Sequence, residues 1–333
     1  MIDKKFKLFS NCFSVKGINR ALILDLQRKN YYILPNQIID FINEYSGKKV
    51  YDLFRDFKND KTILKKYIRY FLKNELVIID NDLNLYPAIS NNFDRPYRID
   101  TITLDLNLPI LTLKEFLEIN VDNLGVSCLK LISDNFNLKK IVDTLHFVDK
   151  SKIKTIVIFI KYRDGLETEL INLKKTFFRI TEIIFYDVDI TNDSEVKKFI
   201  YEKKSLSEVL SMTIYNHDDF VLSFENFNES LSFNTAYNRT IFIDLNGDIK
   251  RHIEDQSVFG NIDIADLNEV VDNEEVKKFW AISKDKILIC KDCEFRYICP
   301  DGSIPFKEKE TDIFYSTKTK CNYDPYKNLW NNA

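Results

Sequence analysis

The sequence predicts an α/β protein made of three parts: a front domain of strands and helices, a middle of alternating strands and helices, and a cysteine-rich end. Three observations support this division. Short stretches before residue 35 alternate apolar and polar residues, and helical spacing follows them. From about residue 100, short apolar runs alternate with helical patterns, which is typical of a parallel sheet. Four of the six cysteines lie after residue 289.

The front domain, residues 1–90, is expected to be winged-helix-like. Alternation predicts a three-stranded meander at residues 6–13, 21–26 and 30–34, with turns at Lys16-Gly17 and Arg28-Lys29. Pro35 can begin a helix, which Gly47 ends. Two further helices are expected at 50–57 and 62–73, followed by a β-ribbon at 76–79 and 84–86.

The middle, residues 91–235, begins with a loop at Asn91. Six strands are expected there, with helices between them such as 138–147 and 166–176; the strands are residues 101–106, 126–131, 153–160, 182–186, 209–214 and 219–223. Six repeats of this spacing fit either a partial (β/α)6 barrel or an open doubly wound sheet. After it, residues 236–333 begin with a hairpin around Asn246-Gly247-Asp248, and a helical stretch at 276–280 follows.

The cysteine-rich end has the spacing C-x2-C-x5-C-x21-C, formed by Cys290, Cys293, Cys299 and Cys321. A close first pair with two later thiolates is typical of a metal site, and soft thiolates select zinc or an iron-sulfur centre. The alternative is a disulfide framework. We favour metal, because no secretion signal marks the chain and C-x2-C pairs in cytosolic proteins more often bind metal or do redox work.

Composition argues against several partners. The net charge of -3 comes from 48 basic and 51 acidic residues spread along the chain, so no nucleic acid is expected. No apolar run is long enough for a membrane span and no signal core opens the sequence, so we expect a cytoplasmic protein without a membrane partner. The seven glycines form neither a Walker sequence nor G-x-G-x-x-G, so no nucleotide binding is expected.

The front domain resembles the PqqD-like leader-peptide recognition element in the order of its strands and helices. The resemblance implies that a ribosomally made precursor peptide adds as a strand and lies against the third helix. The implied peptide-binding residues are Tyr31, Tyr32 and Ile33 on the strand, and Lys65, Lys66, Arg69 and Tyr70 on the helix. Alternatively, the tyrosines are ordinary strand residues and the basic positions a solvated helix face.

The cysteine segment, together with residues 243–249 and 259–262, resembles the SPASM domain of radical-SAM peptide maturases. The resemblance covers roughly residues 100–333, and it is strongest to the maturases of grasp-with-spasm systems. It implies a degenerate radical-SAM-like partial barrel before a small SPASM metal domain. It also implies two partners, an ATP-grasp ligase and the precursor peptide.

Departures from the radical-SAM pattern limit what the resemblance implies. The C-x3-C-x2-C loop that would follow the strand at 101–106 is absent, so no S-adenosylmethionine is expected. The other two cysteines, Cys12 and Cys128, are isolated in strand patterns and are expected to be small buried residues. SPASM domains commonly hold two clusters, but His252 and Ser303 stand where the second would need cysteines. One 4Fe-4S cluster is therefore expected, with zinc as the alternative.

We hypothesise an auxiliary maturation protein that binds the precursor peptide and presents it to the ligase, and we assign no catalytic residue. The first alternative is a peptide-modifying redox enzyme that uses the remaining cluster, or an open barrel mouth lined by Asp105, Tyr186, Asp187 and Asp189. The second is a structural metalloprotein without a peptide partner, which would leave the front domain unexplained.

Overall fold

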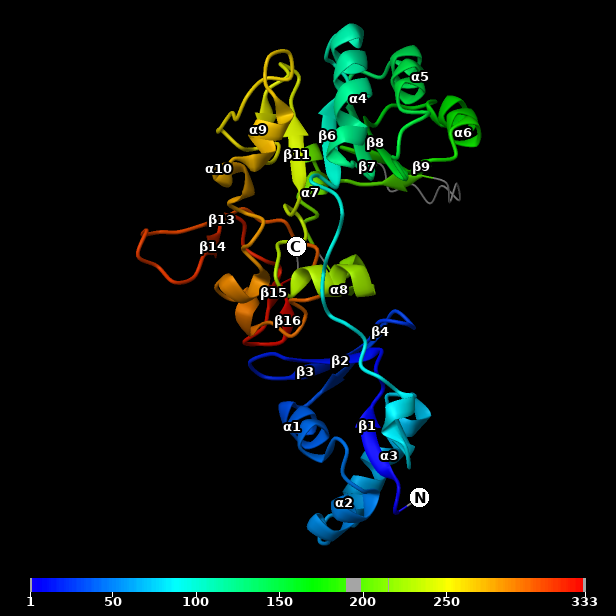
Figure 1. Cartoon of the computed structure of the whole chain (residues 1–333), viewed down its shortest axis with the longest axis vertical. Coiled ribbons are helices and arrows are strands. Elements are labelled where there is room, and N and C mark those ends of the chain that lie inside the picture. Colours follow the sequence, from blue (N-terminus) through cyan, green and yellow to red (C-terminus); the bar gives the residue numbers. More distant parts are fainter. Residues whose placement is uncertain (1, 190–198, 215, 332–333) are drawn as a thin grey trace.

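A computed structural model describes residues 2–189, 199–214 and 216–331. The front domain lies at one end of the molecule and the central sheet at the other (Figure 1). The cysteine-rich segment lies between them, and residues 87–98 run along the side as a linker.

The front domain has a three-stranded meander and three helices, as predicted, but the first strand of the meander lies later in the sequence than expected. The strands β2 (Cys12–Lys16), β3 (Ala21–Asp25) and β4 (Asn30–Leu34) form an antiparallel sheet in that order. The helices α1 (Asn36–Tyr45), α2 (Val50–Asp56) and α3 (Lys61–Lys73) follow, with α1 starting directly after Pro35 as predicted.

Two predictions for the front domain were wrong. The expected strand at 6–13 is broken, and its first half is a separate strand, β1 (Lys5–Leu8), which pairs with β5 (Val77–Asp80). The second strand of the expected ribbon is a single 3-10 turn, η1 (Leu83–Leu85). The Asp82 side chain accepts a hydrogen bond from the backbone N–H of Asn84, which favours the turn over an extended strand.

The meander is buried on both faces. Ile23 of β3 packs into the core formed with α1 and α3, whereas its neighbours Leu22 and Leu24 pack against the cysteine-rich segment and α8 (Phe224–Ser230). Successive strand residues point to opposite faces, so a strand covered on both sides is apolar throughout. This explains why every residue of β3 is buried.

The middle region contributes most of a seven-stranded sheet with the order β10-β9-β8-β7-β6-β11-β12. All neighbours are parallel except β11 and β12. This confirms the predicted α/β class. The strands are β6 (Thr101–Asp105), β7 (Cys128–Ser133), β8 (Thr155–Lys161), β9 (Ile180–Tyr186), β10 (Ile200–Tyr201), β11 (Thr240–Ile243) and β12 (Ile249–Lys250).

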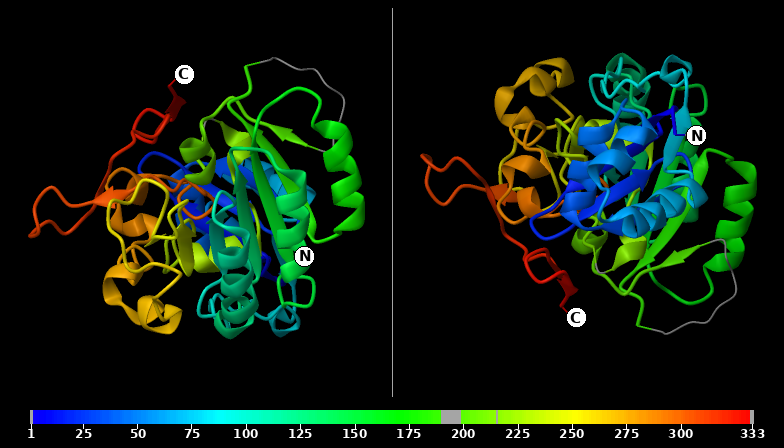
Figure 2. Two further views of the ribbon diagram at one scale, coloured as in Figure 1. Left: turned by 90° about the horizontal axis from the view of Figure 1, so that it is seen from above. Right: turned by 90° about the horizontal axis from the view of Figure 1, so that it is seen from below.

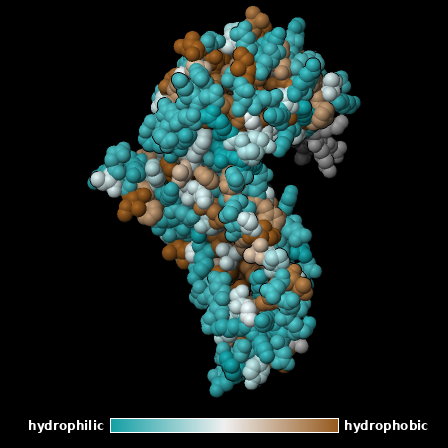
Figure 3. All heavy atoms as spheres, in the orientation of Figure 1, coloured by the Kyte–Doolittle hydropathy of each residue, from teal (hydrophilic) through white to brown (hydrophobic). Residues whose placement is uncertain are grey.

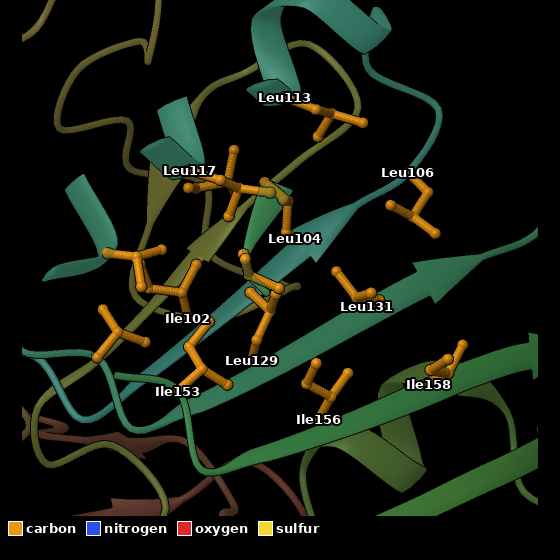
Figure 4. Close-up of a cluster of buried hydrophobic side chains, with 14 of the residues drawn as sticks. Ile102, Leu104, Leu106, Leu113, Leu117, Leu129, Leu131, Ile153, Ile156 and Ile158 are labelled. Carbon is orange, nitrogen blue, oxygen red and sulfur yellow. The ribbon is translucent and has the colours of Figure 1, made fainter. Parts of the chain in front are cut away.

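Three helices cover one face of this sheet. They are α4 (Ile110–Leu124), α5 (Leu138–Phe147) and α6 (Glu167–Thr176), and their apolar sides pack on alternate strand residues such as Leu104 and Leu131 (Figure 4). A doubly wound sheet needs such helices on both faces, so that alternative does not describe this sheet. The opposite face packs on the short helix α7 (Leu206–Leu210).

The last two strands predicted for the middle region were wrong. Residues 206–210 form α7, because Ser205 and Glu208 cap its N-terminus reciprocally. Residues 217–219 form a 3-10 turn, η2 (His217–Asp219), and the Ser223 side chain caps α8. Polar caps therefore override the strand-like apolar residues between them.

After residue 235 the predicted hairpin is present as β11 and β12, and β11 also extends the central sheet beside β6. The divisions at residues 90 and 235 stay predictions. Seen from above, the segment after residue 280 lies on the opposite side of the sheet from α6 (Figure 2). The elements that follow β12 are short: α9 (Leu267–Asp272), α10 (Glu274–Lys277), η3 (Lys284–Lys286), η4 (Cys290–Asp292), β13 (Pro305–Phe306), β14 (Ser316–Thr317), β15 (Tyr323–Asp324) and β16 (Leu329–Trp330).

Hydrophilic side chains dominate the face shown in Figure 3, and apolar ones lie there in small groups. Within the described residues, no helix is long and apolar enough to cross a bilayer.

Candidate metal centre

The fold brings the four predicted cysteines, Cys290, Cys293, Cys299 and Cys321, to one place. All four line a single cavity of about 30 Å³. Its other walls are mainly apolar, and they include Ile214, Phe220, Phe295 and Tyr323. The sequence spacing predicted that these thiols would meet, and they do so at a site where all four are half-buried.

All four cysteines are free thiols rather than disulfides. Across residues 2–189, 199–214 and 216–331, no group of three or more Cys, His, Asp or Glu side chains is arranged so that it could hold a metal ion. The thiols thus surround one cavity without forming a closed ligand set. In small cysteine sites the ligands take up their final arrangement when metal binds. The groups around the sulfurs show whether thiolates could be accommodated here.

Backbone amides point at three of the four sulfurs. Tyr323 N donates to Cys321 Sγ at 3.4 Å, and the backbone amides of Phe295 and Asp301 act to lower the pKa of Cys293 and Cys299. In each case the donor is two residues after the cysteine. Such bonds stabilise a thiolate over a thiol, and hydrogen bonds to sulfur are a recognised feature of iron-sulfur sites. The loops are therefore shaped to accommodate thiolates.

Without a cation, burial opposes ionisation of the same sulfurs. It raises the thiol pKa of Cys290 and Cys321 to about 11 and that of Cys299 to about 12. Burial also raises the pKa of Cys293 well above its ordinary value. Only a thiolate ligates metal, so this site needs a bound cation to bring the pKa values down. By residue type, four thiols are the ligands that a tetrathiolate zinc or iron-sulfur centre uses, and metal binding at this site stays a prediction.

Ile289 precedes the first cysteine in an unfavourable backbone conformation. Its φ of 69° lies in the left-handed region, which a β-branched residue rarely adopts. The Cys290 amide donates to Leu288 O at 2.8 Å and closes this turn. Strain of this kind persists where the surroundings enforce it, often at functional sites, and here it occurs directly before the first cysteine.

The turn between β2 and β3, residues 17–20, is fastened to the cysteine segment. Ile18 N donates to Asp292 O at 2.8 Å, between the first two cysteines. The backbones approach so closely that a Cβ on Gly17 would lie 2.8 Å from Glu294 N. Glycine is required here by this close approach, and the front domain is positioned directly by the cysteine segment.

A buried ion pair completes this junction. Arg20 Nε lies 2.5 Å from an oxygen of Glu294, whose side chain is 1% exposed. Tyr323 Oη donates to the same oxygen at 2.6 Å and accepts from Arg20 Nη2 at 2.9 Å. Glu294 follows Cys293, and Tyr323 lies two residues after Cys321. The front domain thus supplies the counter-charge for a carboxylate beside the cysteines.

A second junction joins the predicted docking strand to the C-terminal segment through His217. Its Nδ1 lies 2.9 Å from Tyr31 Oη, and Trp330 Nε1 donates to its Nε2 at 2.9 Å. Indole N–H only donates, so Nε2 carries no proton and we assign the proton to Nδ1, which donates to Tyr31. Local sequence does not indicate a role for His217, because its partners lie 186 and 113 residues away.

Acidification should open this second junction. Desolvation, followed by the charge of Arg20, lowers the pKa of His217 below 6.5, while Asp218 and Glu294 oppose the shift. The stabilising contribution is therefore full above pH 6.5 and is lost as pH falls through the depressed pKa, because a proton on Nε2 displaces the Trp330 bond.

We expect Trp330 fluorescence in a Trp280→Phe background to change with a midpoint below pH 6.5. The matched control is His217→Gln, which should remove the transition. A midpoint above 6.5, or an unchanged transition in the Gln variant, contradicts the assignment.

The structure separates the predicted peptide-binding residues into two groups. Tyr31 faces the C-terminal segment and belongs to the junction just described. Tyr32 on β4 and Tyr70 on α3 lie next to each other, with their ring centroids 6.2 Å apart. Ile33, Lys65, Lys66 and Arg69 are exposed on the strand and the helix. Peptide binding by these residues stays a prediction.

The residues that stand where a second cluster would need cysteines, and the two isolated cysteines, lie in ordinary packed surroundings. His252 stacks on Phe279 at 22°, and its Nδ1 accepts from Glu254 N, so it is part of a core. Ser303 is buried beside Asp301. Cys12 is buried as expected, whereas Cys128 is only half-buried.

At the carboxyl edge of the sheet, Tyr186 donates to Asp134, and burial raises the pKa of Asp105. Asp187 pairs with Lys161 at 3.4 Å, and Asp189 is exposed. The proposed mouth residues thus have ordinary structural partners or face solvent.

Fold and site define a mixed α/β protein whose mostly parallel sheet carries a four-cysteine segment and a small front domain. No family model matches the chain, and no curated protein matches it. A solved structure with partial likeness is Streptococcus suis SuiB bound to S-adenosylmethionine, with 12% identity and a TM-score of 0.31. The alignment covers 89% of this chain and 95% of that chain. A TM-score of this size does not establish a shared fold.

Proposed function

We propose that this protein binds a ribosomally made precursor peptide on the front domain and presents it to a partner ATP-grasp ligase. The observation that supports this most is the edge strand β4. It ends the three-stranded sheet, and no other strand within the described residues pairs with its outer edge. An unpaired edge beside a helix is a common site for an extended peptide to add as a strand.

The surroundings of β4 suit such a peptide. Tyr32 and Tyr70 offer aromatic surface between strand and helix, and Lys65, Lys66 and Arg69 are exposed on α3. Backbone groups of β4 would supply affinity, the two tyrosines would hold an apolar side chain, and the basic positions would favour an acidic leader.

The middle region serves as a scaffold in this proposal. The sheet face opposite α4, α5 and α6 is filled by side chains, among them Ile132, Phe159 and Phe242, against α7. A scaffold that holds peptide near a ligase raises the effective concentration of the peptide without bond chemistry of its own. The cysteine-bound metal would fix the segment on which the front domain sits.

The test is binding of a labelled, extended acidic peptide to the full chain, measured by fluorescence anisotropy of the peptide. We expect Tyr32→Ala combined with Tyr70→Ala to weaken binding about tenfold or more, as loss of anchoring aromatics does. The matched control is Tyr51→Ala, a tyrosine 54% exposed on α2. Undetectable binding by the unaltered protein, or equal losses in the control, would contradict the proposal.

A further inference from the structure

One lysine of the C-terminal segment lies in an unusual place. Lys284 begins the short helix η3, and its side chain is 5% exposed. Lysine is almost never fully buried unless a partner compensates its charge. This lysine lines the same cavity as Cys290, Cys293, Cys299 and Cys321.

The protein partners of Lys284 compensate its charge only in part. Its ammonium donates to the backbone oxygen of Asp301, and the carboxylate of Asp301 is 3.7 Å away. That carboxylate also accepts the Ser303 amide at 3.0 Å. Asp301 does not line the cavity, whereas Lys284 does. Lys284 therefore forms part of the cavity wall beside the sulfurs, and its positive charge acts on Cys290, Cys299 and Cys321, as does the negative charge of Asp301.

We infer that Lys284 is a fixed counter-charge for an anionic tetrathiolate centre formed by the four cysteines. This rests on the proposed metal centre and adds a residue that acts on it from outside the ligand set. Four thiolates around a doubly charged core leave a net negative charge in an apolar cavity. Burying that charge is costly unless a cation is close, and Lys284 supplies the cation.

Neutral thiols or a disulfide would not need this cation. With protonated sulfurs, the ammonium would have the Asp301 carboxylate, 3.7 Å away, as its counter-charge but no anion in the cavity itself, and a Met or Leu would fill the space without the cost of desolvation. The placement of Lys284 thus favours thiolates held by metal over the disulfide alternative.

The experiment measures zinc affinity of the full chain by anaerobic chelator competition. We expect Lys284→Met to weaken zinc binding about tenfold or more, the usual cost of losing a group that supports the ligands. The matched control is Lys286→Met on the same helix, whose exposed side chain bonds Ala281 O at 2.7 Å. This control should bind zinc as the unaltered protein does.

Asp301→Asn distinguishes an effect of the Lys284 charge on the metal centre from a structural effect of the ion pair between Lys284 and Asp301. It removes the negative charge 3.7 Å from the Lys284 ammonium and retains the backbone oxygen to which the lysine donates. If Lys284 acts through its charge, zinc binding becomes equal or tighter. If Lys284 and Asp301 form only a structural ion pair, both variants weaken zinc binding alike, and the inference is wrong.

If Lys284→Met does not fold, Asp301→Asn alone decides by the direction of its effect. Unchanged affinity in a folded Lys284→Met protein overturns this inference and leaves the metal centre standing. Failure of the unaltered protein to bind zinc or hold a cluster overturns both. In protein that carries a cluster, Lys284→Met should also move the midpoint potential to more negative values, because the reduced state loses a neighbouring cation.

Discussion

Cys293→Ser is expected to abolish metal binding and to loosen two parts of the molecule together. Removing one thiolate from four leaves a ligand set that cannot close, and in small cysteine sites the metal supplies about 10–16 kcal/mol of apparent folding free energy. The β2-β3 turn is bonded to this segment twice: Ile18 N donates to Asp292 O, and Arg296 Nη1 donates to Lys16 O, each at 2.8 Å. The turn should therefore loosen as well.

Hydrogen exchange by mass spectrometry would show this directly. Faster exchange is expected in residues 290–299 and 321–330, and also in residues 16–20, while β7 and β8 should be unchanged. Cys128→Ser is the matched control, since Cys128 lies in β7 away from the array. Full metal occupancy and unchanged exchange in Cys293→Ser would contradict the assignment of this cysteine as a ligand.

Arg20→Met is expected to cost about 3–5 kcal/mol of unfolding free energy, the range seen when one partner of a buried ion pair is removed. The variant leaves the Glu294 carboxylate buried with Tyr323 as its remaining partner. The measurement is urea unfolding followed by Trp330 fluorescence, since Trp330 packs near this junction.

Arg55→Met is the control for Arg20→Met. Arg55 is 57% exposed and pairs with Asp52 and Asp56 on the surface, so its loss should cost about 1 kcal/mol or less. If Arg20→Met is no more costly than Arg55→Met, the junction does not hold the front domain on the cysteine segment.

Local patterns in the sequence predicted the elements that local forces build. The β/α rhythm identified β6 to β9, and the order of strands and helices identified most of the front domain. The cysteine spacing predicted that four thiols would lie together, because three of them are separated by short loops. The failures at residues 209–214 and 219–223 have a local cause too, since caps at Ser205 and Ser223 outweighed apolar strand signals.

The remaining parts of the site depend on contacts between distant segments. Arg20 meets Glu294 across 274 residues, and His217 meets Tyr31 across 186. Nothing near these residues in the sequence indicates the pairing. Lys284 resembles any surface lysine until the fold buries it beside the cysteines. Charge compensation inside a core is set by tertiary structure, so a single sequence does not reveal it.

The metal centre is tested most directly by the iron, acid-labile sulfide and zinc content of anaerobically purified protein, recorded with its visible spectrum. The prediction is one 4Fe-4S cluster per chain, absent from Cys293→Ser and retained in Cys128→Ser. One zinc without sulfide would retain the four-cysteine site as a structural centre and remove the redox alternative. Neither iron nor zinc, with all four thiols open to alkylation in the folded protein, would contradict the metal centre.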